Sequence, residues 1–101
     1  MTQDAFHSLA DAERLLAEAE HVPAQARPAA VAALRALLLE WGVPPAGDST
    51  VALLEQVAAT DETVLEFRPE AAVLDRYPDA PDAADRARIF VDAARARLAN
   101  I

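Results

Sequence analysis

The chain has 101 residues, a length suited to one domain and too short for two. Its 17 acidic and nine basic residues give a net charge of −8, so long-range repulsion opposes nonspecific binding to the phosphate backbones of nucleic acids. There is no Cys, which excludes disulfides, thiolate nucleophiles and Cys-ligated zinc.

Hydropathy gives no sign of a membrane protein. No stretch approaches the roughly 20 consecutive apolar residues of a membrane span, and residues 1–11 lack the basic start and apolar run of a signal peptide. We therefore expect a soluble, cytoplasmic protein. Apolar residues make up 53% of the chain, and nearly half of them are Ala. A domain of this size buries only roughly 60 to 70% of its unfolded surface, so a second copy would add useful burial.

Strand patterns are nearly absent, because the Val and Ile residues fall within repeats of 3.6 rather than in alternation. The sequence therefore predicts an all-α fold. In the first predicted helix an apolar stripe is formed by Phe6, Leu9, Ala12, Leu16 and Ala19, opposite a charged face. We expect this helix to end near Val22 and Pro23, since a residue before Pro favours an extended backbone.

The second helix is predicted from about Pro28 to Trp41 and is apolar almost all the way round. Its stripe of Val31, Leu34, Leu38 and Trp41 is widened by Leu37, while Leu39 lies on another side. Only Arg35 and Glu40 are charged. Such a helix is central in its own bundle or is covered by another subunit. We take Leu37, Leu39 and Trp41 as candidate interface residues.

The remaining segments are shorter. Gly42 and the Pro44–Pro45 pair end the second helix, and Asp48, Ser49 or Thr50 can cap a third one. A fourth segment, capped by Thr60 or Asp61, should carry Val64, Leu65 and Phe67 inward before Pro69 interrupts it. A closing helix is expected from about residues 81–83, with an inward stripe of Ala83, Ala87, Phe90, Val91, Ala94 and Leu98. The prediction is a single domain, 1–101, folded as an antiparallel up-and-down bundle of four or five helices.

Two segments resemble HEPN domains, the higher-eukaryote and prokaryote nucleotide-binding family. The first is residues 29–57, AAVAALRALLLEWGVPPAGDSTVALLEQV, and the second is residues 74–79, LDRYPD. The first is similar to a small-residue helix that ends in Gly and is followed by a Pro-bearing loop and an amphipathic helix; the second is similar to the Arg-Tyr-Pro segment before the last helix of many members. The resemblance implies a helical bundle, usually dimeric, of the kind found in toxin–antitoxin and nucleotidyltransferase-partner systems.

The chain departs from the catalytic members of that family, which cleave RNA with an Arg, four to six intervening residues and a His late in the domain. No His follows His21, and Asp48 occupies the loop position where many members carry a His. Arg14 and His21 do have six residues between them, but they lie in the first helix, and we interpret the spacing as chance. An enzyme is therefore not the expected function.

His7 lies between Asp4 and Asp11 at spacings that place all three on one helix face. Two carboxylates and one imidazole on an exposed face are typical of a solvated charge cluster, so we expect no metal and no cofactor.

Arg76, Tyr77 and Asp79 form the most specific polar segment. Arg76 suits a bidentate contact with a carboxylate or phosphate, and Tyr77 offers an apolar ring with a polar tip. The competing interpretation is structural: Arg76 and Asp79 satisfy helix ends and Tyr77 fills the bundle. Arg35 and Arg68 are the other cations that could reach the same groove.

The leading hypothesis is a non-enzymatic, HEPN-like interaction module. It would form a homodimer, or bind a partner such as a nucleotidyltransferase or a toxin–antitoxin component, through Leu37, Leu39 and Trp41. The alternative is nucleotide or RNA binding, as in a divergent ribonuclease, in a groove lined by Arg35, Arg68 and Arg76. A structural or regulatory bundle without a ligand is a third possibility.

Overall fold

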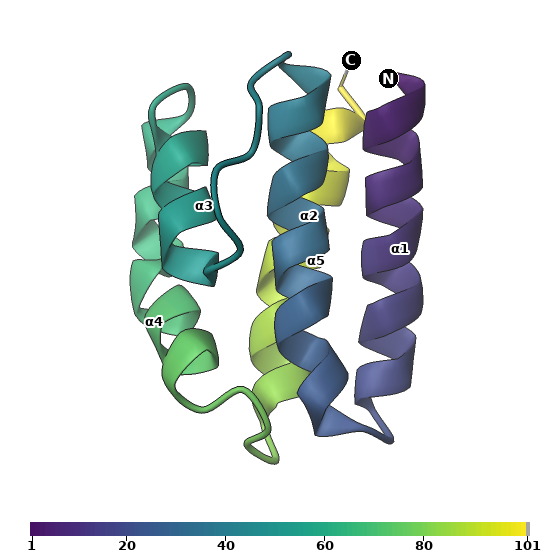
Figure 1. The fold of residues 1–101 in the computed structure, drawn as a ribbon, viewed down its shortest axis with the longest axis vertical. Helices are drawn as coiled ribbons and strands as arrows, with labels where there is room; N and C mark the ends of the chain where they lie inside the picture. Colours follow the sequence, from purple (N-terminus) through teal and green to yellow (C-terminus); the bar gives the residue numbers. More distant parts are fainter. Residues whose placement is uncertain (101) are drawn as a thin grey trace.

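A computed structural model describes residues 1–100, and within that range all regular structure is helical. The elements are α1 (Gln3–Ala19), η1 (Pro23–Gln25), α2 (Ala26–Glu40), α3 (Thr50–Ala58), η2 (Glu62–Phe67), α4 (Arg68–Arg76) and α5 (Ala83–Leu98) (Figure 1). The predicted all-α class is confirmed. The predicted fourth segment is a 3-10 helix, η2, which runs directly into α4.

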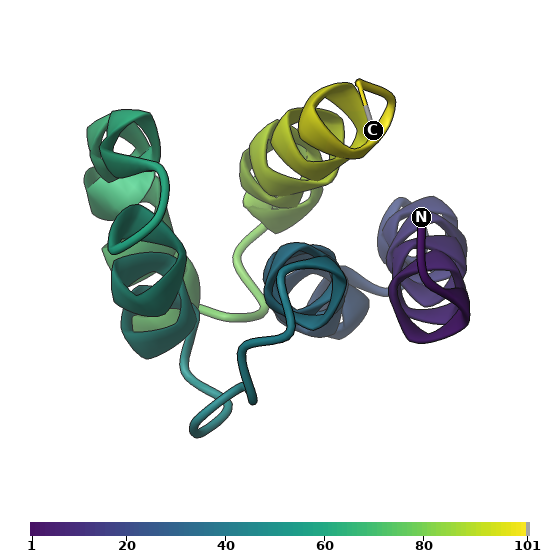
Figure 2. The same cartoon turned by 90° about the horizontal axis from the view of Figure 1, so that it is seen from above.

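The helices form two layers around α2. Helices α1, α2 and α5 pack as a triangle, and the α3–η2–α4 hairpin covers the opposite side of α2 and α5 (Figure 2). As a result α2 contacts all four other helices. The narrow polar strip of α2 thus reflects a central position within its own chain.

Burial follows from this central position. Nine of the 15 residues of α2 are buried, and Leu37 is only 1% exposed. Leu37 is therefore covered by its own chain, unlike an interface residue. Leu39 and Trp41 remain half-buried. Around α2 the core is completed by large side chains from every other helix, including Leu9, Leu53, Leu54, Leu74 and Phe90.

Local capping explains where the helices begin and end. Thr2 caps α1 by accepting a hydrogen bond from the amide of Ala5, and Ser49 caps α3 by accepting one from Ala52. At the end of α2, Gly42 has φ 72°, its amide donates to Leu39, and the next amide, of Val43, donates to Leu38. These two bonds are the Schellman pattern, which needs a left-handed residue and so favours Gly.

The path between α2 and α3 departs from the predicted up-and-down order. Arg27, in the first turn of α2, donates to the carbonyl of Asp48 just before α3 begins. Residues 41–49, which we call the connector, therefore turn back along part of α2, and α3 runs parallel to α2 (Figure 1). The Pro44–Pro45 pair, read as a simple helix stop, lies in this extended return.

No helix within residues 1–100 is long and apolar enough to cross a membrane.

Two leucines two positions apart in α2 test this account of burial. We expect Leu37→Ala to lower the free energy of unfolding by about 2 to 5 kcal/mol, because it leaves a cavity in a packed core. Leu39→Ala, at a half-buried position, should lower the free energy of unfolding less than Leu37→Ala does. The side chain of Leu65 is 44% exposed, so Leu65→Ala should cost about 0.5 kcal/mol or less. Urea denaturation followed by circular dichroism measures all three. Equal losses at positions 37 and 39 would contradict the described packing.

Candidate functional site

Most arginines of the chain are paired with its own carboxylates, but of the three candidate ligand-binding arginines, Arg35, Arg68 and Arg76, only Arg68 is paired. Seven of the nine Arg side chains form ion pairs within residues 1–100, a range that contains all nine. They are Arg14 with Asp11 and Glu18, Arg27 with Asp75, Arg68 with Glu55, Arg86 with Glu70 and Asp82, Arg88 with Glu20 and Asp85, Arg95 with Glu13 and Asp92, and Arg97 with Asp61. Arg35 and Arg76 have no carboxylate partner there.

Four of these arginines make α5 the hub of the polar contacts. Arg88 and Arg95 are seven positions apart, close to two turns, and both reach α1 or the residue after it: Arg88 contacts Glu20 at 3.2 Å and Arg95 contacts Glu13 at 3.0 Å. Arg86 and Arg97 are eleven positions apart, close to three turns, and reach the α3–η2–α4 hairpin on the opposite flank. These side chains thus join the two layers and have structural partners.

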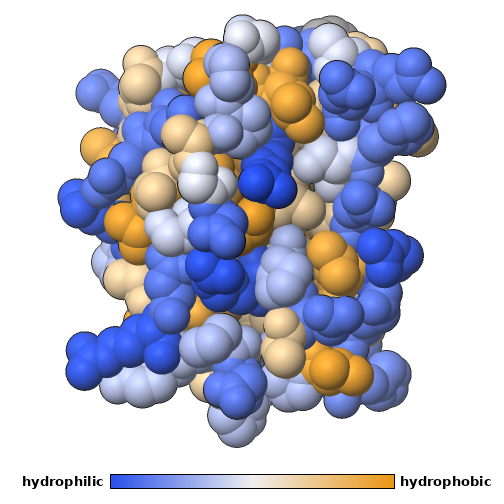
Figure 3. All heavy atoms as spheres, viewed as in Figure 1, coloured by the Kyte–Doolittle hydropathy of each residue, from blue (hydrophilic) through white to orange (hydrophobic). Residues whose placement is uncertain are grey.

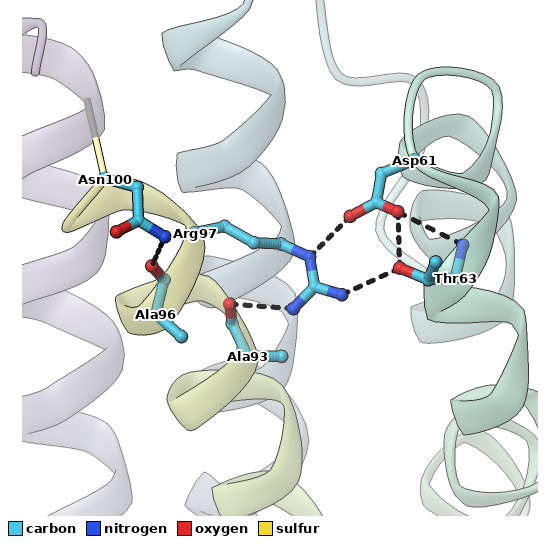
Figure 4. A network of polar contacts seen from close by, with 6 residues as sticks. All are labelled: Asp61, Thr63, Ala93, Ala96, Arg97 and Asn100. Carbon is cyan, nitrogen blue, oxygen red and sulfur yellow. Dashed lines mark hydrogen bonds and ion pairs between the residues drawn. The ribbon is translucent and has the colours of Figure 1, made fainter.

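The contact of Arg97 lies at the start of η2 (Figure 4). Its Nε donates to Asp61 Oδ2 at 2.6 Å, and its Nη2 donates to the Thr63 hydroxyl at 3.0 Å. Asp61 also accepts hydrogen bonds from the hydroxyl and the amide of Thr63. The hydrogen bonds from Thr63 and then from Arg97 hold the pKa of Asp61 below its ordinary value of 3.8.

A second network surrounds Asp75, in the last turn of α4. Its carboxylate accepts hydrogen bonds from the amides of Thr50 and Val51, the first residues of α3, at 2.9 and 3.0 Å, and from Arg27 Nε at 2.9 Å. An anion at a helix N-terminus satisfies free N–H groups and complements the helix dipole. Burial alone would raise the pKa of Asp75, but the hydrogen bonds from Val51, Thr50 and Arg27 outweigh it and hold this pKa below 3.8.

The predicted trio of Arg35, Arg68 and Arg76 has three different environments. Arg68 pairs with Glu55 of α3 at 2.7 Å. Arg35 is exposed and makes one long contact, 3.5 Å, with the carbonyl of Gly47. Arg76 lies over the ring of Tyr77 at 5.4 Å. No pocket is present over residues 1–100, so no groove lined by the three is described.

Tyr77 and Asp79 lie on the surface. Tyr77 is 53% exposed, so it does not fill the bundle as the structural interpretation required. Asp79 is also exposed and has no ion pair in the described part of the chain. Arg76 and Tyr77 thus form a small exposed cation–aromatic pair at the end of α4.

The two histidines are exposed and belong to separate settings. The ring of His7 is 6.0 Å from that of Phe6, and His21 follows the end of α1. Arg14, which is separated from His21 by six residues, donates to the carboxylate of Glu18 at 2.7 Å. Within residues 1–100 no group of three or more acidic or His side chains is placed to hold a metal ion.

Large apolar side chains are exposed at scattered positions. The most exposed within residues 1–100 are Met1, Phe6, Val22, Leu65 and Tyr77. On the face that carries α1, α2 and the connector, apolar residues form small patches separated by polar ones (Figure 3). Of the predicted interface residues, Leu39 and Trp41 are the two with accessible surface.

Sequence reasoning missed Arg27 and Asp75, the pair that joins α2, α3 and α4. They lie 48 positions apart, and no local sequence pattern around either residue predicts a contact with the other. Asp75 was part of the LDRYPD segment but had no assigned role. A capping function for Asp75 could have been suggested only by knowing that the last turn of α4 lies against the start of α3.

A scan of the sequence against protein-family models found no match, and comparisons with curated proteins and with solved structures also found none.

The two lowered pKa values predict acid sensitivity. A carboxylate with a lowered pKa in the folded state contributes stability above its unfolded pKa of 3.8, and this contribution is lost as the pH falls through the folded value. We therefore expect the free energy of unfolding to fall from about pH 5 towards about pH 2, less steeply in Asp75→Asn and Asp61→Asn. The control Asp79→Asn, which removes an exposed carboxylate without an ion pair, should keep the wild-type slope. Urea denaturation at a series of pH values measures these slopes, and an unchanged slope in Asp75→Asn would refute the assignment.

Proposed function

We propose that this chain is a non-enzymatic helical interaction module of the HEPN type, which forms a homodimer or binds a partner protein through the surface around Leu39 and Trp41. One observation carries the proposal. Leu39 is the Leu of α2 that is only half-buried, while Leu34, Leu37 and Leu38 are enclosed. Leu39 and the half-buried Trp41, on different sides of the end of α2, offer the aliphatic and aromatic anchors typical of protein interfaces.

The order of structural features supports the HEPN assignment. A small-residue helix ends at Gly42, a connector with Pro44 and Pro45 follows, and α3 is a short amphipathic helix. The Arg76–Tyr77–Pro78 segment then precedes α5, the long closing helix. On the strength of this resemblance we propose a nucleotidyltransferase or a toxin–antitoxin component as the class of partner when the partner is not a second copy.

The polar contacts support a role without catalysis. Seven arginines neutralise carboxylates of the same chain, and Arg14, the only one at the catalytic spacing from a His, is held by Glu18 and Asp11. A catalytic His must reach the proton that it transfers, and His21 is exposed beyond the end of α1. The side chains that ribonuclease chemistry would need are thus used for folding or lie apart.

An equilibrium sedimentation experiment tests the interaction surface. We expect wild type to sediment as a dimer at tens of micromolar, or to be captured by a partner in a pull-down, and Leu39→Glu to lose either association, because a buried charge opposes contact. The matched control is Leu65→Glu, a charge at an exposed Leu of η2, which should behave as wild type. A monomeric wild type with no captured partner would sink the proposal, and equal loss in both variants would move the interface away from Leu39.

A second function, nucleotide or RNA binding, is favoured by one specific observation. Arg35 and Arg76 have no carboxylate partner within residues 1–100, and Arg76 already lies over the exposed ring of Tyr77. An exposed aromatic ring beside a guanidinium can stack a base and contact a phosphate, worth about 1 to 3 kcal/mol per stacked base. The net charge of −8 opposes this function.

Fluorescence anisotropy with a labelled short RNA, and with a labelled nucleotide, separates this second function from the first. At low salt we expect Arg76→Ala to weaken binding about tenfold, since it removes the unneutralised cation beside Tyr77. Arg68→Ala is the matched control on the same helix; its charge is neutralised by Glu55, so its effect should stay within about twofold. No binding by wild type, or equal binding by Arg76→Ala, removes this function.

A further inference from the structure

The connector, residues 41–49, has no regular structure, and its backbone is held by side chains from helices. Gln56 of α3 donates to the carbonyl of Pro44 at 3.1 Å and accepts from the amide of Ala46 at 2.8 Å. Arg27 donates to the carbonyl of Asp48 at 2.9 Å. Side chains of α2 and α3 therefore hold the backbone of the connector in place.

Apolar anchoring of the connector is weak. None of its nine residues is fully buried, whereas Thr50, the next residue, is 0% exposed. Val43 packs against the core while remaining half-buried. Because regions with few buried contacts open locally at lower free energy than the core, the connector should open without global unfolding.

Two glycines define where it can bend. Gly42 has φ 72° and Gly47 has φ 81°, and a Cβ placed at either would meet no atom within 4 Å. Both positions are thus left-handed and open to solvent. The segment between them, residues 43–46, contains the two prolines, which make it stiff. When the hydrogen bonds at its ends break, a stiff segment between two glycines moves as one piece.

The connector leads directly into α3, which begins at Thr50. The first turn of α3 is held by Asp75 through the amides of Thr50 and Val51. A movement of the end of the connector therefore acts on the turn that Asp75 holds.

We propose that Asp75 and Arg27 form a latch, and that breaking it releases the first turn of α3 and the connector together as one opening unit. Arg27 joins the two parts, because the same guanidinium contacts Asp75 and the carbonyl of Asp48. The Thr50 hydroxyl is buried beside this carboxylate, so the start of α3 packs directly against Asp75. Opening would lift Val43 from the boundary of α2 and α3.

Amide hydrogen exchange followed by NMR tests the latch. One amide of the connector makes no contact with Asp75 or Arg27, so its exchange rate shows whether the connector opens together with α3. The amide of Ala46 bonds to Gln56 and contacts neither Asp75 nor Arg27. We expect Asp75→Asn to accelerate exchange about tenfold or more at Thr50, Val51 and also Ala46, and to leave core amides of α2 unchanged. Faster exchange at Thr50 and Val51 alone would overturn the proposal.

Two further variants complete the test. Asp61→Asn removes a comparable carboxylate, which is paired with Arg97. It should accelerate amide exchange at Thr63 and leave the exchange rate at Ala46 unchanged. If Asp75→Asn does not fold, Arg27→Lys takes its place: it keeps the charge, but a single ammonium replaces the guanidinium fork that joins Asp75 to Asp48, so Ala46 should again exchange faster. Unchanged exchange at Ala46 in that variant refutes the latch.

Discussion

The structure depends on covering one helix from every side. The apolar residues of α2 extend around most of its circumference, so neither a single neighbour nor one layer of neighbours can remove them from water. Helices α1 and α5 cover one side, and the α3–η2–α4 hairpin covers the other. The need for this second layer explains why the chain returns along α2 before α3 begins, since the return places α3 beside α2 over its length.

The layers are joined by apolar burial first and by ion pairs second. Leu53, Leu54 and Leu74 bring the hairpin onto the core with almost no exposed surface. The ion pairs at the borders are half-exposed, and such pairs contribute little each, typically about 0 to 1 kcal/mol. Their effect is to fix orientation: Arg86 of α5 contacts Glu70 in the first turn of α4, and Arg97 contacts Asp61 just before η2, which sets how the hairpin lies against α5. Asp75 differs from them because it also caps α3.

Features encoded over a few residues could be predicted from the sequence, while features that depend on distant contacts could not. The stop at Gly42, the cap at Ser49 and the inward stripe of α5 follow from neighbouring residues, and the structure has all three. The parallel course of α3 was missed because proline indicates where a helix ends and says nothing about the direction taken afterwards. The candidate groove of Arg35, Arg68 and Arg76 stays a prediction, but the pairing of Arg68 with Glu55 was missed for the same reason, because it is a tertiary contact that local sequence does not encode. The pattern of α2 did predict burial, but the choice between a central helix and a subunit interface needed the positions of the other helices.

The two proposals meet at Gly42. Leu39 and Trp41, the proposed interaction residues, lie immediately before this pivot, and the amide of Gly42 is bonded to the carbonyl of Leu39. A partner seated on Leu39 and Trp41 would order the end of α2 and thereby restrict the pivot at which the connector swings. By linkage, if partner binding strengthens the binding of an agent to the closed connector, that agent strengthens partner binding by the same factor. The coupling can be weak, because the latch at Asp75 acts at the other end of the connector, where α3 begins. The proposed interaction surface and the proposed latch thus lie near opposite ends of the connector, and coupling between them would depend on the stiffness that Pro44 and Pro45 give this segment.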